Sequence, residues 1–156
     1  MSQRDPSAYI QGLTLLARRE LSEAQVRQRL SRRGYEAAAI DAAIARLKEE
    51  RAIDDSRVAG AIARVQSGYK GRGRQRVLRQ IEVAGIAGAV ARRAVDEVFS
   101  TVSEDNLLAA ALDKRLRGRE EIDDDNEFQR VYRHLVRQGF ETDRVLKVLA
   151  VRRRSR

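Results

Sequence analysis

SEAQVRQRLSRRGYEAAAIDAAIARLKEERAIDD, residues 22–55, is the stretch that decides the fold. It begins with Ser22, whose hydroxyl can accept a hydrogen bond from an unpaired N–H group at the start of a helix. Val26 and Leu30 follow at helical spacing. Gly34 then supplies the residue type that best tolerates the left-handed conformation after a helix. A second apolar stripe at helical spacing comes next: Ile40, Ile44 and Leu47.

The same pattern occurs three times in the chain. Each copy has a branched apolar residue, an apolar residue four positions later, a glycine four positions after that, and then a large apolar side chain. The copies are Val26, Leu30, Gly34 and Tyr35; Val77, Ile81, Gly85 and Ile86; and Val131, Leu135, Gly139 and Phe140. Three copies in register indicate an internal repeat. One unit of about 50 residues buries little apolar surface, so we expect neighbouring units to pack against each other.

Helical periodicity predicts nine helices, three in each unit. The first ends near residue 19, and the others span about 22–33, 36–50, 54–67, 73–84, 87–99, 103–117, 126–138 and 141–153. Alanine is abundant and the alternation typical of strands is absent, so we predict no strand. The expected units are 1–53, 54–102 and 103–156.

Composition limits the class of protein. The chain has 156 residues, 42% of them hydrophobic, and no cysteine, which excludes a disulfide framework and a thiolate metal site. No run of ~18 apolar residues could span a membrane, and the N-terminal MSQRDPSAYI lacks the apolar core of a signal peptide. We therefore expect a cytoplasmic protein. We also expect a monomer, because no long apolar stripe is left unpaired.

The charge of the chain points to a polyanionic partner. Lysine and arginine total 32 against 23 acidic residues, which gives a net charge of +9. Such an excess attracts nucleic acid or an acidic protein surface without identifying which one. Arginine suits both, because its planar fork matches phosphates and carboxylates alike.

The most prominent basic segment runs through Lys70, Arg72, Arg74, Arg76 and Arg79. If the whole segment were helical, its arginines 72, 76 and 79 would project from one face and its apolar residues from the other. The glycines before it would let a partner approach the backbone closely. We interpret this face as a contact for DNA phosphates or an acidic protein; the alternative is a solvated outer face. A phosphate-binding Walker loop is excluded, because no GKS or GKT is present and no strand precedes it.

Two smaller basic groups are further candidates. Arg29, Arg32 and Arg33 lie at helical spacing, where a solvated face explains them as well as binding does. Arg152, Arg153 and Arg154 belong to a basic C-terminal end that could supplement DNA binding or remain disordered.

The acidic and titratable residues do not form a catalytic set. Asp54 and Asp55 are best explained as the cap of a helix. The acidic residues of 120–125 lack the glycine and terminal glutamate of a calcium loop, so a solvated capping linker is the better reading. His134 is the single histidine and has no cysteine partner. We therefore expect no enzymatic activity, no cofactor and no metal.

Three segments resemble the RecX family of regulators of the bacterial recombinase RecA. They are GYEAAAIDAAIARLKEERAIDDSRVA (34–59), GYKGRGRQRVLRQIEVAGI (68–86) and FQRVYRHLVRQGFETDRVLKVL (128–149). The sequence departs from the family pattern at Val58, where the family usually has an aromatic residue, and at Ile81, where it usually has leucine. The resemblance implies an all-α fold of three tandem three-helix repeats in an elongated, curved, right-handed solenoid.

The same resemblance implies a function. A protein of this family would lie in the groove of the RecA–DNA filament and restrain ATP hydrolysis, strand exchange and coprotease activity. Its partners would be RecA and single- or double-stranded DNA, bound without sequence preference. Two alternatives stay open: a free-standing basic DNA-binding protein, and a helical scaffold for an acidic protein.

Overall fold

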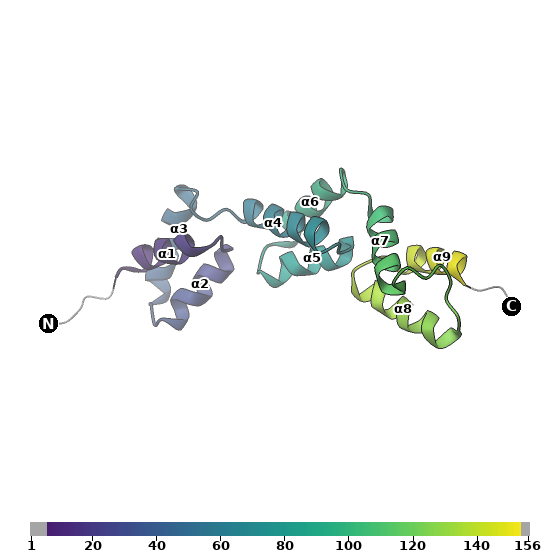
Figure 1. Ribbon diagram of the computed structural model, residues 1–156. Coiled ribbons are helices and arrows are strands. Elements are labelled where there is room, and N and C mark those ends of the chain that lie inside the picture. The colour runs from purple at the N-terminus through teal and green to yellow at the C-terminus, as the bar shows by residue number, and fades with distance from the viewer. Residues whose placement is uncertain (1–5, 154–156) are drawn as a thin grey trace. The chain divides into compact units, whose positions relative to one another are not determined.

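The computed structural model describes residues 6–153, and this part of the chain is all-α. It contains nine α-helices and one π-helical turn (Figure 1). They are α1 Ala8–Arg18, α2 Glu23–Arg32, α3 Ala37–Glu49, α4 Asp55–Arg64, the π turn Val65–Tyr69, α5 Arg74–Val83, α6 Gly88–Phe99, α7 Glu104–Leu116, α8 Asp125–Arg137 and α9 Thr142–Arg152. Residues 6–153 contain no β-strand, and their β-structure is limited to an isolated bridge between Ile122 and Arg153. The predicted all-helical repeat fold is confirmed.

One expected boundary is wrong. The predicted helix 54–67 does not end at Ser67. Its α-helical part ends at Arg64, and the backbone then widens into the π turn, which continues to Tyr69. The N–H of Lys70 donates to the carbonyl of Val65 (3.0 Å), and the N–H of Arg72 donates to that of Gln66 (2.9 Å). Arg72 therefore lies in the connection before α5 and not on a helix.

The apolar stripes of α2 and α3 enter one hydrophobic core with α1. Val26 and Leu30 of α2 are fully buried, and Ile44 and Leu47 of α3 lie beside them. Gly12 of α1 lets these helices approach, since a Cβ there would lie 2.7 Å from a methyl group of Leu47. The apolar residues that the sequence placed on one side of α2 and α3 are thus the ones that pack in this core.

A second core is built in the same way by α7, α8 and α9. Val131 and Leu135 of α8 face Leu108 and Leu112 of α7, and Phe140 is 2% exposed just after the α8 glycine. Phe140 donates its N–H to the carbonyl of Leu135, which closes the end of α8 with the bond expected of a left-handed glycine cap.

Contacts within the chain gather in two compact units, and each unit combines segments that are distant in sequence. One unit joins the chain up to Ala59 with Ile81–Ala91; the other joins Gly60–Gln80 with the chain from Arg92 onward. The reason lies in two junctions, one in each unit, at which the beginning of one helix meets the end of another.

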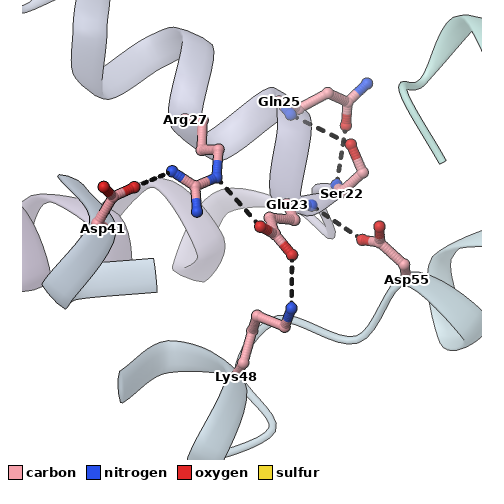
Figure 2. A network of polar contacts seen from close by, with 7 residues as sticks. All are labelled: Ser22, Glu23, Gln25, Arg27, Asp41, Lys48 and Asp55. Atoms are coloured by element: carbon pink, nitrogen blue, oxygen red, sulfur yellow. Dashed lines mark hydrogen bonds and ion pairs between the residues drawn. The ribbon is translucent and has the colours of Figure 1, made fainter. Parts of the chain in front are cut away.

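In the first unit, the beginning of α2 meets the end of α5. The Ser22 hydroxyl accepts from the N–H of Gln25 (3.2 Å) and donates to the carbonyl of Ala84. Gly85, at φ +78°, follows, and a Cβ there would lie 2.4 Å from that of Ala24. The first residue of α4 joins the contact, because the Asp55 carboxylate accepts from the N–H of Glu23 (2.9 Å; Figure 2).

Charged side chains extend this junction across α2 and α3 (Figure 2). The Glu23 carboxylate binds Lys48 at 2.8 Å and Arg27 at 3.1 Å, and Arg27 reaches Asp41 at 2.6 Å. The hydrogen bond from Lys48 is the main reason that the pKa of Glu23 lies below its ordinary value. Four charges therefore hold the beginning of α2 to α3.

In the second unit, the beginning of α5 meets the end of α8 in the same manner. The N–H of Gly73 donates to the carbonyl of Gln138 (2.9 Å), and that of Gln75 donates to the carbonyl of Gly139 (3.1 Å). The Glu104 carboxylate, at the first residue of α7, accepts from the N–H of Arg74 (3.2 Å). Glu104 thus corresponds to Asp55 of the first junction, since each carboxylate accepts an N–H from the beginning of the other helix.

Candidate nucleic-acid interface

The basic segment before and along α5 is divided between structural and exposed side chains. The Arg72 guanidinium donates to the side-chain oxygen of Gln138, and Arg76 donates to the carbonyl of Arg137 (3.3 Å). Both side chains are half-buried at the second junction. The predicted single cationic face of arginines 72, 76 and 79 is wrong, because Arg72 precedes the helix and the first two arginines hold the end of α8.

The other three cations of the segment differ from one another. Arg74 pairs with Asp96, and its guanidinium lies 5.2 Å from the centre of the Phe99 ring. Lys70 and Arg79 are exposed and have no ionic partner within residues 6–153. These two are therefore the members of the segment that are free to meet a polyanion.

The basic group at the end of α2 has no neutralising partner within residues 6–153: Arg32 and Arg33 are exposed, and Arg29 is half-buried. Arg29 donates to the carbonyl of Gln25 (3.3 Å), and no carboxylate in the described part of the chain pairs with Arg29, Arg32 or Arg33. Burial, followed by the positive charges of Arg19 and Arg32, lowers the pKa of Arg29. Arg19 is a member of this cluster that sequence spacing did not indicate, since it follows α1 and lies ten residues before Arg29 in the sequence.

The basic C-terminal group is used inside the protein. Arg152 pairs with Asp113 at 3.0 Å and donates to the carbonyl of Glu120. Arg153 pairs with Asp125, and Arg154 lies outside the described residues. Arg152 and Arg153 therefore hold the end of α9 to neighbouring segments, and their contact with DNA stays a prediction.

The acidic residues are likewise occupied with capping. Asp54 accepts from the N–H of Arg57 (3.0 Å), and Asp124 accepts from that of Glu127 (2.7 Å). Glu127 in turn pairs with Arg119, whose hydrogen bond lowers the pKa of the Glu127 carboxyl. Residues 6–153 hold no group of three side chains suited to a metal ion.

A groove in the second unit is lined by three segments, two of which contribute cations. Its volume is about 650 Å³, within the range typical of ligand sites. It is lined by Gly68, Tyr69, Lys70, Gly71 and Arg72 after α4, by Leu107, Ala110, Ala111, Lys114, Arg115 and Arg117 of α7 and its end, and by His134 and Gln138 of α8. The lining has five lysines and arginines and no carboxylate. We refer to it below as the cationic groove.

Sequence reasoning found two of these cations, Lys70 and Arg72, and missed Lys114, Arg115 and Arg117. A signal was present, because KRLR at 114–117 ends a predicted helix. Basic residues in a last helical turn are, however, normal complements of the helix dipole. Only the fold brings this turn beside the segment that follows α4.

His134 lies at the wall of the groove. Burial lowers its pKa below the ordinary value of 6.5, and the charges of Arg115, Arg137 and Arg72 lower it further. The imidazole is therefore neutral near pH 7 while the surrounding guanidiniums are charged. A bound anion would oppose these positive charges and favour protonation of the ring.

No helix in residues 6–153 is long and apolar enough to cross a membrane.

Comparison with known proteins gives consistent results. A family model described as "RecX, first three-helix domain" matches residues 8–47. Among curated proteins, the chain is 30% identical over 135 residues to "Regulatory protein RecX" of Syntrophotalea carbinolica, covering 85% of this chain and 88% of that protein. It is 32% identical over 134 residues to "Regulatory protein RecX" of Halorhodospira halophila, covering 85% and 80%. A crystal structure of RecX from Lactobacillus salivarius has the same fold, with a TM-score of 0.72, 18% identity, and coverage of 92% of this chain and 95% of that one.

Proposed function

The chain belongs to the RecX family of regulatory proteins, and on this premise we propose that it restrains the RecA recombinase by binding the RecA–DNA filament. The proposal assigns the protein no chemistry of its own. It would hold the filament in one conformation, and thereby slow ATP hydrolysis, strand exchange and coprotease activity. Its working form would be a monomer, with its helical repeats in contact with successive filament subunits.

The structural observation that carries the proposal is a set of exposed cations without ionic partners. Arg32 and Arg33 at the end of α2, and Arg79 on α5, have no carboxylate partner within residues 6–153. An exposed charge that serves no internal pair is available to a polyanion such as the filament, which presents DNA phosphates and protein carboxylates together. Arginine binds both kinds of group.

Single-stranded-DNA-dependent ATP hydrolysis by RecA tests the proposal. The protein is titrated from substoichiometric to equal ratios, and we expect ATP turnover to fall. The combined variant Arg32→Ala, Arg33→Ala, Arg79→Ala should need at least about tenfold more protein for the same suppression. Arg72 and Arg76 are left intact, because their removal would disturb the second junction.

The control removes three cations that are paired with carboxylates of the protein, by the changes Arg46→Ala, Arg119→Ala and Arg144→Ala. It has the same net charge as the test variant, so a general loss of positive charge affects both equally. Suppression retained by the control and weakened in the test variant supports contact through Arg32, Arg33 and Arg79. If the wild-type protein leaves ATP turnover unchanged at every ratio, the proposed function is wrong.

A further inference from the structure

The cationic groove is unusual because it combines positive charge with an exposed aromatic ring. Tyr69, the last residue of the π turn, is 89% exposed, and its side chain makes no hydrogen bond or ring contact with any residue in 6–153. An aromatic ring normally buries most of its surface, so this position gives up stabilisation that packing would supply. π-Helical turns are also frequent at functional sites.

The floor and the rim of the groove suit the two parts of a nucleotide. Leu107, Ala110 and Ala111 provide an apolar wall. Lys70 and Lys114 lie exposed at its edge, with no carboxylate partner in the described part of the chain. Apolar and aromatic surface accepts the face of a base, and exposed ammonium groups accept the phosphates on either side.

Two glycines lie close to Tyr69 in the sequence and expose the main chain at the groove. Gly68 and Gly71 both border the groove, and a Cβ added to either would meet no atom within 4 Å. Gly71 adopts φ +62°, a conformation that other residues rarely take. The main chain at Gly68 and at Gly71 is therefore not covered by side chains from other segments of the described chain.

Together these features identify a class of ligand. We propose that the cationic groove binds single-stranded nucleic acid, with the Tyr69 ring stacked on an unpaired base and Lys70 and Lys114 on neighbouring phosphates. A duplex keeps its bases paired and stacked, so it offers no free face to the ring. An acidic peptide would satisfy the lysines and leave Tyr69 unused. The inference rests on the proposed function, because it treats DNA as part of the target. It adds that the binding site is the cationic groove and that the bound nucleic acid is single-stranded.

The test uses the isolated protein without RecA and a fluorescein-labelled oligothymidylate, with anisotropy as the readout. Tyr69→Leu keeps an apolar side chain and removes the ring, so binding should weaken roughly tenfold or more. Tyr69→Phe keeps the ring and should bind as the wild type does. Affinity for a labelled duplex should be the same for all three proteins.

The phosphate contacts are tested by Lys70→Gln with Lys114→Gln. Each phosphate contact to a single strand contributes about 0.7 to the slope of log affinity against log salt, so this variant should lower the slope by about 1.4. The control, Arg130→Ala with Lys147→Ala, removes two cations outside the groove and should leave the slope unchanged. Circular dichroism and thermal unfolding establish that each variant is folded.

Three outcomes would overturn the inference. Wild-type affinity of Tyr69→Leu for the oligothymidylate would show that the ring does not stack on a base. Equal losses in Tyr69→Leu and Tyr69→Phe would assign the effect to the hydroxyl. Competition by polyglutamate, together with no effect of Tyr69→Leu, would identify an acidic-protein site instead. Failure of the regulatory proposal is recognised separately, since a protein that binds oligothymidylate through Tyr69 and leaves RecA unaffected would keep this inference and lose that one.

Discussion

Gly34, Gly85 and Gly139 end equivalent helices and have equivalent left-handed conformations, at φ +85°, +78° and +98°. Their surroundings differ. A Cβ on Gly139 would lie 2.4 Å from the backbone nitrogen of Arg76, whereas one on Gly34 would meet nothing within 4 Å. The reason is that Gly85 and Gly139 each lie at a junction, and the end of α2 is not covered by such a contact.

This difference predicts unequal effects of one substitution. Gly34→Ala should lower the free energy of unfolding by about 1 kcal/mol, because an L-residue is strained at positive φ. Gly139→Ala carries the same strain and adds an overlap with backbone, so it should lower stability by a further ~2 kcal/mol or more. Urea unfolding of both variants measures the difference. Equal losses would show that the second junction does not contribute to stability.

Ser22 predicts a similar contrast between two helix caps. Ser22 and Ser103 each accept an N–H at the beginning of a helix, and Ser22 also donates to the buried carbonyl of Ala84. Ser103→Ala should cost about 1 kcal/mol, the usual value of a cap. Ser22→Ala should cost about 2 kcal/mol, since it also leaves that carbonyl without its partner. If thermal unfolding shows the two variants to be equally stable, the Ser22–Ala84 bond contributes nothing.

At the scale of elements, helix periodicity was a sufficient guide to the cores. Val26 and Leu30, like Val131 and Leu135, are buried as their spacing predicts. The predicted cationic face failed at Arg72 because that projection treated the whole segment as helical, whereas the π turn and the positive φ of Gly71 place Arg72 before α5. The cationic groove was predicted only in part, because contact between the end of α7 and the segment after α4 depends on tertiary packing.

α8 carries a prediction about acid stability. The pKa of His134 is depressed in the folded protein, so the unfolded chain binds its proton first as the pH falls below 6.5. The free energy of unfolding should therefore decrease between about pH 7 and pH 5.5. His134→Gln removes the titrating group and should make this decrease smaller in urea unfolding. The charged groups that act on the ring are the guanidiniums of Arg72, Arg115 and Arg137.

The opposite result would be informative for the same element. If the His134→Gln variant loses as much stability as the wild type over this pH range, then the ring is not held neutral by its cationic neighbours. Glu23, whose pKa is also lowered, does not contribute to the change in stability between pH 7 and pH 5.5. Its contribution is complete above 4.5 and is lost only as the pH falls through its lower folded value, which is a separate range.

At the scale of the whole molecule, the choice is between a filament regulator and a free-standing DNA-binding protein. A regulator should bind RecA–DNA filaments far more tightly than it binds the same DNA alone, because the filament offers protein and phosphate contacts together. Co-sedimentation with filaments and anisotropy on naked DNA give the two affinities at one salt concentration. Equal affinities would favour the free-standing DNA-binding protein.

The repeat boundaries at 53/54 and 102/103 remain a prediction, and the two junctions give them a physical meaning. Each junction uses main-chain groups, a glycine without a Cβ, and one carboxylate from the first residue of α4 or α7, and the first junction adds the Ser22 hydroxyl. Such a contact requires particular residue types at only a few positions of each repeat. A duplicated segment 54–102, inserted after the original, would bring both halves of the junction with it. Chains of this design could thus lengthen during evolution by whole repeats, without a new interface being invented each time.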